Sequence, residues 1–290
     1  MREYLRIVKT VLAKGKKKED RTGVGTLSVA GMMFQHDLSR GFPLLTTKKV
    51  PFRLVASELE FFIRGITDKK WLQERDNHIW DEWCAPAKVP YAHDAKTKKK
   101  MLAERDLGPL YGWQWRHFGG RYKDYKTNYK GRGVDQLARL VEDLKTKPYS
   151  RQMLVLAWNP GDIAKVVPPF CHYGFQATVT QNKLNLFWSQ RSVDVAIGLP
   201  FNIASYATLL HLLARETGYS EGMLTGFLAD THIYLNHLEG MAEQLKRDPK
   251  KYPLPKVETK NFTSIFDWQY TDTEVLNYQS YPRIKFEIAV

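Results

Sequence analysis

The sequence predicts an α+β fold, because helical and strand patterns follow one another without regular alternation. Apolar residues recur at helical spacing in four segments, residues 4–12, 52–63, 137–144 and 238–245. Runs rich in β-branched and aromatic residues predict strands at residues 26–34, 153–158, 173–180, 184–189 and 223–229. Residues 203–214 are apolar nearly all round, which predicts a fully buried helix.

Single residues mark where several elements should begin or end. Gly15 is placed to stop the first helix, and Asp135 lies near the start of the helix over residues 137–144. Residues 181–183 predict the turn of a hairpin between two strands. The segment 107–118 is too aromatic for a plain linker, and no internal repeat is present.

The composition predicts one large domain. A chain of 290 residues with 43% apolar content can bury a sizeable core, and no break in composition divides it. We therefore expect a single domain over residues 1–290, with residues 84–105 as a polar, basic insertion without a clear period. The longest apolar stretches are shorter than the ~20 residues of a membrane helix, so no membrane association is expected.

Cysteine content and net charge limit the kinds of protein that this chain can be. Cys84 and Cys171 are too few for a disulfide framework or a cysteine-based zinc site, and no ligand cluster has metal spacing. We therefore expect a protein of the reducing cytoplasm without a metal. The net charge of +13 favours anionic ligands or nucleic acid, although the lysine runs at residues 14–18 and 98–100 are typical of solvated loops.

Cys171 is the candidate nucleophile. It follows Pro168, Pro169 and Phe170 and comes just before a predicted strand. A thiol acts at neutral pH when its pKa is lowered, which a nearby arginine or a protonated His172 would do. The alternative is a small buried apolar residue, which is the commoner role of a single cysteine.

Several polar residues lie where no periodicity requires them. Arg191 and Ser192 would suit a phosphate, because a guanidinium fork and a hydroxyl both donate to phosphate oxygens. Asn202 could read the edge of a pyrimidine, or it could cap the buried helix. Glu58 lies at the edge of an apolar helical stripe, where a carboxylate is costly unless it is paired or used. Arg21, in a loop with two glycines, is a weaker phosphate candidate.

Five separated motifs carry a resemblance to a known family. They are DRTGVGTLS (20–28), IWDEW (79–83), LGPLYGWQWRHF (107–118), RSVDVAIGLPFNIASY (191–206) and DTHIYLNH (230–237). In this order they closely resemble the thymidylate synthases, and the similarity extends from about residue 2 to Val290. The resemblance implies an α+β subunit with a mixed sheet and a homodimer formed through packed sheets. It implies dUMP and 5,10-methylenetetrahydrofolate as substrates, and dTMP and dihydrofolate as products.

The resemblance also implies catalytic roles for matching positions. Cys171 would attack C6 of the uracil ring, and Tyr111 would help to remove the C5 proton through water. Glu58 would order water and move protons near O4, and Asn202 would select uracil over cytosine. Asp194 would belong both to the catalytic group and to the folate site.

Binding positions follow from the same resemblance. The phosphate would contact Arg21, Arg191 and Ser192, with Arg151 donated across the dimer interface. His232 and Tyr234 would hold the deoxyribose 3′-hydroxyl. The folate would contact or be enclosed by six positions, Trp80, Asp194, Gly198, Phe201, Ala289 and Val290.

The sequence departs from the family pattern close to the thiol. Phe170 stands where proline is usual, Gln152 replaces a second phosphate-binding arginine, and Ala229 replaces a glycine. Gly174 and Ala177 are small where larger side chains are common, and they could admit a water to the reaction intermediate. That would produce hydroxymethyl-dUMP, as in phage hydroxymethylases of this family. We favour methylation, because Trp80 and residues 288–290, which should shield the intermediate, are retained.

A third hypothesis is a nucleic-acid-binding protein built on this fold. Its motivation is the charge of +13 and the two lysine runs. It requires strongly salt-dependent binding that survives Cys171→Ala. The retained active-site motifs favour the enzyme, for which nucleic acid is not required.

Overall fold

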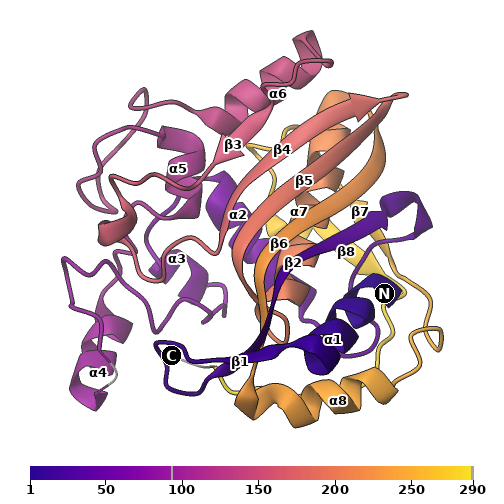
Figure 1. Ribbon diagram of the computed structural model, residues 1–290. Helices are drawn as coiled ribbons and strands as arrows, with labels where there is room; N and C mark the ends of the chain where they lie inside the picture. The colour runs from indigo at the N-terminus through magenta and orange to yellow at the C-terminus, as the bar shows by residue number, and fades with distance from the viewer. Residues whose placement is uncertain (93, 289–290) are drawn as a thin grey trace.

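The chain folds around a six-stranded mixed sheet (Figure 1). The structure is a computed structural model that describes residues 1–92 and 94–288. The sheet order is β1-β2-β6-β5-β4-β3, and neighbours are antiparallel except β5 and β6. Its strands are β1 (Lys16–Lys18), β2 (Thr26–Asp37), β3 (Leu154–Leu156), β4 (His172–Thr180), β5 (Lys183–Asp194) and β6 (Ser220–Tyr234). The predicted α+β class with a mixed sheet is confirmed.

Helices and one small hairpin complete the chain. The helices are α1 (Arg2–Lys14), α2 (Phe52–Ile63), α3 (Lys70–Gln73), α4 (Ala95–Ala103), α5 (Tyr111–His117), α6 (Gln136–Thr146), α7 (Gly198–Thr217) and α8 (Leu238–Lys246). The hairpin pairs β7 (Lys256–Thr259) with β8 (Thr273–Leu276). Each predicted helix and strand is present, and most extend beyond the predicted residues. Among the described helices, none has both the length and the apolar content to cross a membrane.

Helix α7 forms the centre of the core. It connects β5 to β6, and a parallel pair needs such a crossover because a tight turn cannot join its strands. Thirteen of its 20 residues are buried, which confirms the prediction from its all-round apolar sequence. In Figure 1, α7 and α2 lie behind the sheet, so this face of the sheet is covered.

Predicted boundary residues lie where the sequence places them. The Gly15 amide closes α1 on the carbonyl of Val11, and the Asp135 carboxylate caps α6 by accepting from the Ala138 amide at 3.0 Å. Gln181 and Asn182 both have positive φ angles, of 50° and 59°, as a tight β4–β5 hairpin turn requires.

Two features of the structure go beyond what the sequence indicated. Helix α7 begins at Gly198, so Asn202 lies inside it and does not cap it. The insertion at residues 84–105 is not wholly irregular, because it contains α4, whose first turn is capped by Asp94 through the Thr97 amide. Met101 is the one buried residue of α4, so the apolar period that normally reveals a helix is missing there.

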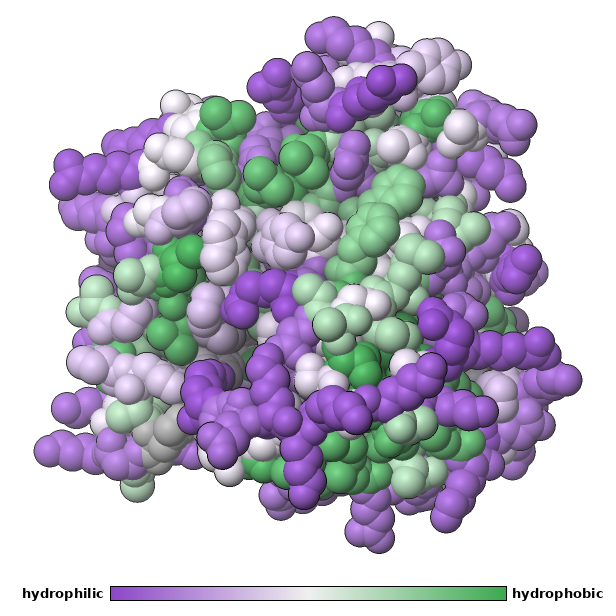
Figure 2. All heavy atoms as spheres, viewed as in Figure 1, coloured by the Kyte–Doolittle hydropathy of each residue, from purple (hydrophilic) through white to green (hydrophobic). Residues whose placement is uncertain are grey.

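The opposite face of the sheet carries exposed apolar side chains. Met33 of β2 is 43% exposed, and Phe227, its register partner in β6, is 48% exposed. Leu154 of β3 is 46% exposed, and Tyr173 of β4 is 36% exposed. Figure 1 shows these strands in front of the helices, and Figure 2 shows apolar residues among polar ones on the same side. Exposed apolar side chains that gather on one sheet face are typical of an interface.

Candidate active site

Backbone contacts fix Cys171 at the entrance to β4. Its amide donates to the Tyr111 hydroxyl at 2.7 Å, and its carbonyl accepts from the Arg191 amide at 2.9 Å. The Arg191 guanidinium donates to the carbonyls of Phe170 and Pro169, both at 2.8 Å. One arginine of β5 therefore holds the segment that precedes the thiol.

Charge around the thiol differs in part from the sequence prediction. Burial raises the pKa of Cys171, while the guanidinium groups of Arg191 and Arg21 act in the opposite direction. The ring of His172 cannot supply the expected positive charge, because burial lowers the pKa of His172 to about 3. The arginines alone therefore provide cationic stabilisation of a thiolate.

Neutral His172 forms part of an aromatic wall. Its Nδ1 lies 2.8 Å from the Tyr206 hydroxyl, and its ring stacks on Tyr111 with centroids 4.3 Å apart. Burial raises the pKa of Tyr111 well above its usual value, so this phenol stays protonated. Tyr111 can therefore act as a hydrogen-bond partner beside the thiol at neutral pH.

Glu58 of α2 faces Trp80 across the site. The Trp80 Nε1 donates to Glu58 Oε1 at 2.8 Å. Burial raises the pKa of the Glu58 carboxyl to about 7, with the Trp80 bond acting against this shift. A carboxyl poised near neutrality can both take up and release a proton, which suits general acid–base catalysis.

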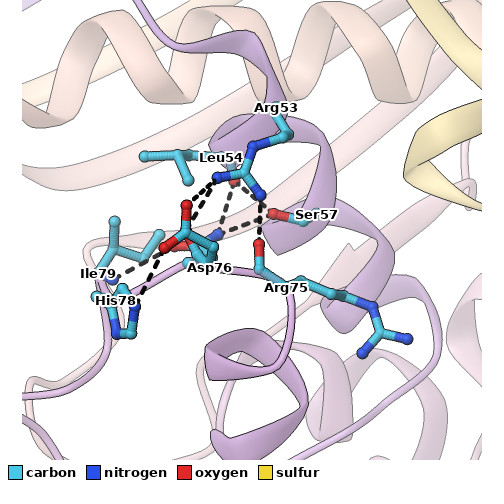
Figure 3. A network of polar contacts seen from close by, with 8 residues as sticks. Arg53, Leu54, Ser57, Arg75, Asp76, His78 and Ile79 are labelled. Atoms are coloured by element: carbon cyan, nitrogen blue, oxygen red, sulfur yellow. Dashed lines mark hydrogen bonds and ion pairs between the residues drawn. The ribbon is translucent and has the colours of Figure 1, made fainter.

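A polar network attaches the Trp80 loop to α2 (Figure 3). Figure 3 shows the Arg53 guanidinium over Asp76, whose carboxylate it contacts at 2.8 Å and whose carbonyl it contacts at 3.1 Å. Asn77 Nδ2 donates to the Leu54 carbonyl at 3.0 Å and to the Ser57 hydroxyl at 2.9 Å. The helix that carries Glu58 therefore also fixes the loop that carries its partner Trp80.

Asn202 is oriented by a second layer of side chains. Gln190 Nε2 donates to Asn202 Oδ1 and to the Ser192 carbonyl, both at 3.0 Å, while Trp188 Nε1 donates to Gln190 Oε1 at 3.1 Å. Gly226 leaves room for Trp188, since a Cβ there would lie 2.3 Å from its ring. With Oδ1 accepting from Gln190, the Nδ2 amino group is the donor that Asn202 can offer to a pyrimidine O4.

A cavity of about 160 Å³ lies where the β1–β2 loop meets the ends of β5 and β6. Its lining includes Arg21, Ser192, His232 and Tyr234. These are four of the residues that the sequence predicts for the phosphate and the sugar. Lys18 also lines the cavity, where it pairs with Asp230. The cavity thus offers the Arg21 guanidinium and hydroxyl groups to an anionic ligand, and its lining also includes Glu19, Asp20 and Asp230.

Comparison with known proteins agrees with this geometry. The sequence model described as thymidylate synthase matches residues 2–290. The chain belongs to the thymidylate synthase family. It is similar to the thymidylate synthase of varicella-zoster virus (strain Dumas), with 43% identity over 291 residues, 99% of this chain and 94% of that protein. It is also similar to the bifunctional dihydrofolate reductase-thymidylate synthase of Paramecium tetraurelia, with 42% identity over 99% of this chain and 61% of that protein.

Some predicted thymidylate synthase positions lie apart from this cluster. Arg151 is exposed just before β3 and does not line the cavity beside Ser192. Ala289 and Val290 lie outside the described residues. Asp194 and Gly198 flank the start of α7, where Asp194 Oδ1 accepts from the amides of Ala196 and Ile197 at 2.9 and 3.2 Å. Phe201, in the first turns of α7, is half-buried against the core.

The suggestion that Gly174 leaves room for water is not supported by its surroundings. A Cβ built on Gly174 would lie 2.8 Å from Leu156 Cδ2 and 3.2 Å from the Val155 carbonyl oxygen. The side chain of Leu156 therefore occupies the space that a larger residue would fill. Ala177 is fully buried in the core.

Sequence reasoning missed three groups that shape the site. Gln190 orients Asn202, as described above. Lys48 is buried, donates to the Ala196 carbonyl, and has its pKa lowered by burial to about 8. Tyr91 of the insertion contacts Arg21. The run Thr46–Lys49 offered a weak signal for Lys48, but no local pattern marks Gln190 or Tyr91.

Proposed function

We propose that this chain converts dUMP to dTMP with 5,10-methylenetetrahydrofolate. One observation carries the proposal: two arginines favour the anionic form of the Cys171 thiol, and on the adjoining strand Gln190, the register partner of His172, orients the Asn202 amide. A soft thiolate can add to C6 of a pyrimidine, and an amide N–H can stabilise charge that develops on O4. Membership of the thymidylate synthase family supports the same reaction.

The chain's own groups account for the individual proton and bond changes. Cys171 Sγ bonds to C6, and the C5=C6 electron pair moves to give an enolate with charge on O4. Asn202 Nδ2 donates to O4, and Glu58 exchanges protons there through water. When bound, 5,10-methylenetetrahydrofolate supplies the one-carbon unit and the hydride. The C5 proton leaves through water beside Tyr111, and loss of Cys171 from C6 restores the ring double bond.

The folate site is proposed for four described residues. Trp80 and Phe201 would provide apolar surface, and Asp194 would provide a carboxylate. A Cβ built on Gly198 would lie 3.7 Å from Asp194 Cβ and 3.8 Å from Asn202 Oδ1, which are ordinary contact distances. The backbone of Gly198 is therefore not covered by other side chains. A ring system can approach such backbone closely, which fits a flat pterin.

Product analysis tests the reaction. The purified chain with dUMP and methylenetetrahydrofolate should give dTMP and dihydrofolate in equal amounts, measured by chromatography with mass detection. Tetrahydrofolate with a hydroxymethyl nucleotide would instead establish the hydroxymethylase alternative. Salt-dependent nucleic-acid binding without either product would favour the third hypothesis.

We further propose that two copies pair through the exposed apolar sheet face, with each donating Arg151 to the other. The face formed by Met33, Leu154, Tyr173 and Phe227 supports a second copy as its occupant, because the ring of Phe187 in β5 stacks on Phe227 and continues the apolar surface. Arg151, exposed beside β3 and outside its own subunit's cavity, is then free to reach the neighbouring site.

Mixing two inactive variants tests this shared site. When Cys171→Ser and Arg151→Ala subunits are dissociated together and allowed to reassociate, activity should return. In a mixed dimer, the Arg151→Ala subunit has its own Cys171 and receives Arg151 from its partner, so one of the two sites is complete. Random pairing makes half of the dimers mixed, so about a quarter of sites should be active. Activity that never exceeds the sum of the parents would refute donation of Arg151 across the interface.

Domain organisation and location complete the proposal. We treat residues 1–290 as one catalytic domain, because the six-stranded sheet combines β1 and β2 from the first half of the sequence with β3 to β6 from the second. The reaction needs Cys171 as a free thiol, and both cysteines are free in the structure. This favours a reducing compartment such as the cytoplasm.

A further inference from the structure

The insertion at residues 84–105 contacts the predicted phosphate site through Tyr91. The Arg21 Nη1 lies 3.4 Å from the Tyr91 hydroxyl oxygen, which accepts from it, and the Arg21 guanidinium carbon lies 5.7 Å from the Tyr91 ring centroid. Arg21 also lines the 160 Å³ cavity with Ser192 and His232. The guanidinium therefore lies between the insertion and the nucleotide cavity.

Tyr91 is itself held by a firmly attached segment. Its ring stacks on Trp83, with centroids 5.4 Å apart and planes within 12°. The buried Lys69 ammonium donates to carbonyls on both sides of Tyr91 in the sequence, those of Asp81 at 3.0 Å, of Trp83 at 2.9 Å, and of Met101 in α4. One side chain therefore ties the segment before Tyr91 to the helix after it.

The backbone that carries Arg21 is also ordered. Asp20 accepts from the Thr22 hydroxyl and from the Gly25 amide at 3.0 Å, and Gly23 and Gly25 adopt positive φ angles of 73° and 76°. The Arg21 side chain, however, is exposed. A free arginine loses up to ~2 kcal/mol of rotamer entropy when it is ordered, so contacts made before ligand binding reduce the cost at binding.

We propose that Tyr91 is a positioning residue that orders Arg21 for the nucleotide phosphate. This inference rests on the proposed function, because the phosphate is that of dUMP. A tyrosine face and hydroxyl acting on an exposed guanidinium contribute on the scale of an exposed cation–π contact, ~0.5–1 kcal/mol. The insertion thereby tunes nucleotide affinity without touching the reacting ring.

A double-mutant cycle on nucleotide affinity tests the proposal. Tyr91→Ala should raise the KM and Kd for dUMP about fivefold, and Tyr91→Phe about twofold, with kcat at saturating dUMP unchanged. In an Arg21→Ala background, Tyr91→Ala should have no further effect, because the group it positions is gone. Isothermal titration with dUMP and steady-state turnover provide the two readouts.

Tyr125→Ala is the matched control. Tyr125 likewise lies under an arginine, with the Arg105 guanidinium carbon 4.8 Å from its ring, but Arg105 does not line the cavity. This variant should bind dUMP as the wild type does. Wild-type affinity in Tyr91→Ala, or an equal loss with and without Arg21, would overturn the positioning role alone. A wild-type chain that fails to bind dUMP would overturn the proposed function as well.

Discussion

The two halves of helix α7 carry buried polar clusters that differ in how completely they are satisfied. Near its start, Asn202 bonds to Gln190, which pairs in register with His172 beside Cys171, and Cys171, Tyr111 and Glu58 all have displaced pKa values. Further along, both ring nitrogens of His211 are engaged, Nδ1 by Glu221 and Nε2 by the Thr259 hydroxyl at 2.9 Å. That second chain continues from Thr259 to Thr273 at 2.7 Å and then to Trp268 at 2.9 Å.

This difference indicates that one cluster along α7 stabilises the fold and that the other serves the reaction. The His211 cluster joins α7, β6, β7 and β8 with each named group paired, so it should stabilise the fold. In the Cys171 cluster, burial raises the pKa values of Cys171 and Glu58 and so makes the thiolate and the carboxylate unfavourable. Such groups lower stability and gain favourable partners only when a ligand arrives.

The largest expected effect is on turnover at the Cys171 cluster. Cys171→Ser should lower turnover by at least about 10³-fold, because a buried hydroxyl is a far weaker nucleophile than a thiolate. The melting temperature and dUMP affinity should stay near wild type, since the arginine contacts run to backbone carbonyls. Calorimetry and a turnover assay measure both, and substantial residual turnover would remove Cys171 from the nucleophile role.

Glu58→Gln should lower kcat by about 10²-fold while making the protein more stable above neutral pH. The folded-state pKa of about 7 lies above the ordinary carboxyl value of 4.5, so the wild type loses stability as pH rises from 4.5 through 7. The variant lacks this loss and should be more stable by about 3 kcal/mol at pH 8, with little difference at pH 4.

Urea unfolding at the two pH values provides the measurement for Glu58→Gln. The pH dependence of kcat/KM should also lose an inflection near pH 7, because this ratio reports the pKa values of the free enzyme. Equal stability of variant and wild type at pH 8 would show that burial of the Glu58 carboxylate does not destabilise the fold.

The contrast between the clusters shows what the sequence could reveal. The all-round apolar run of α7 and the motif around Arg191 are strong local patterns, and they predicted the buried helix and the site residues. The start of α7 was misplaced because Gly198 and Pro200 are usually helix breakers. Pro200 is tolerated there because first-turn amides have no intrahelical acceptor.

Long-range side-chain contacts could not be predicted. The bond from Gln190 to Asn202 and the contact of Arg21 with Tyr91 join residues whose proximity depends on the complete fold. The neutral state of His172 likewise follows from its burial, which the sequence next to Cys171 does not encode. Local pattern therefore predicts candidate reacting groups but not the residues that orient them.

His211→Leu tests the satisfied cluster and should show the reverse of Glu58→Gln. Removing the imidazole leaves Glu221 and Thr259 without their partner, so the free energy of unfolding should fall by about 2 kcal/mol. The kcat at a temperature where the variant is folded should match wild type. A kcat loss as large as that of Glu58→Gln would mean that the two clusters are coupled along α7.

The smallest expected effect concerns packing beside the thiol. Because Leu156 Cδ2 occupies the space next to Gly174, Gly174→Ala should lower the free energy of unfolding by about 1 kcal/mol, and adding Leu156→Val should recover part of that loss. Urea unfolding of the two variants measures this coupling. The ratio of dTMP to hydroxymethyl-dUMP should not change in either variant, because the glycine opens no path for water. If Gly174→Ala instead stabilised the protein and suppressed a hydroxymethyl product, a gap would lie next to Gly174, and the close packing of Leu156 against this glycine would be refuted.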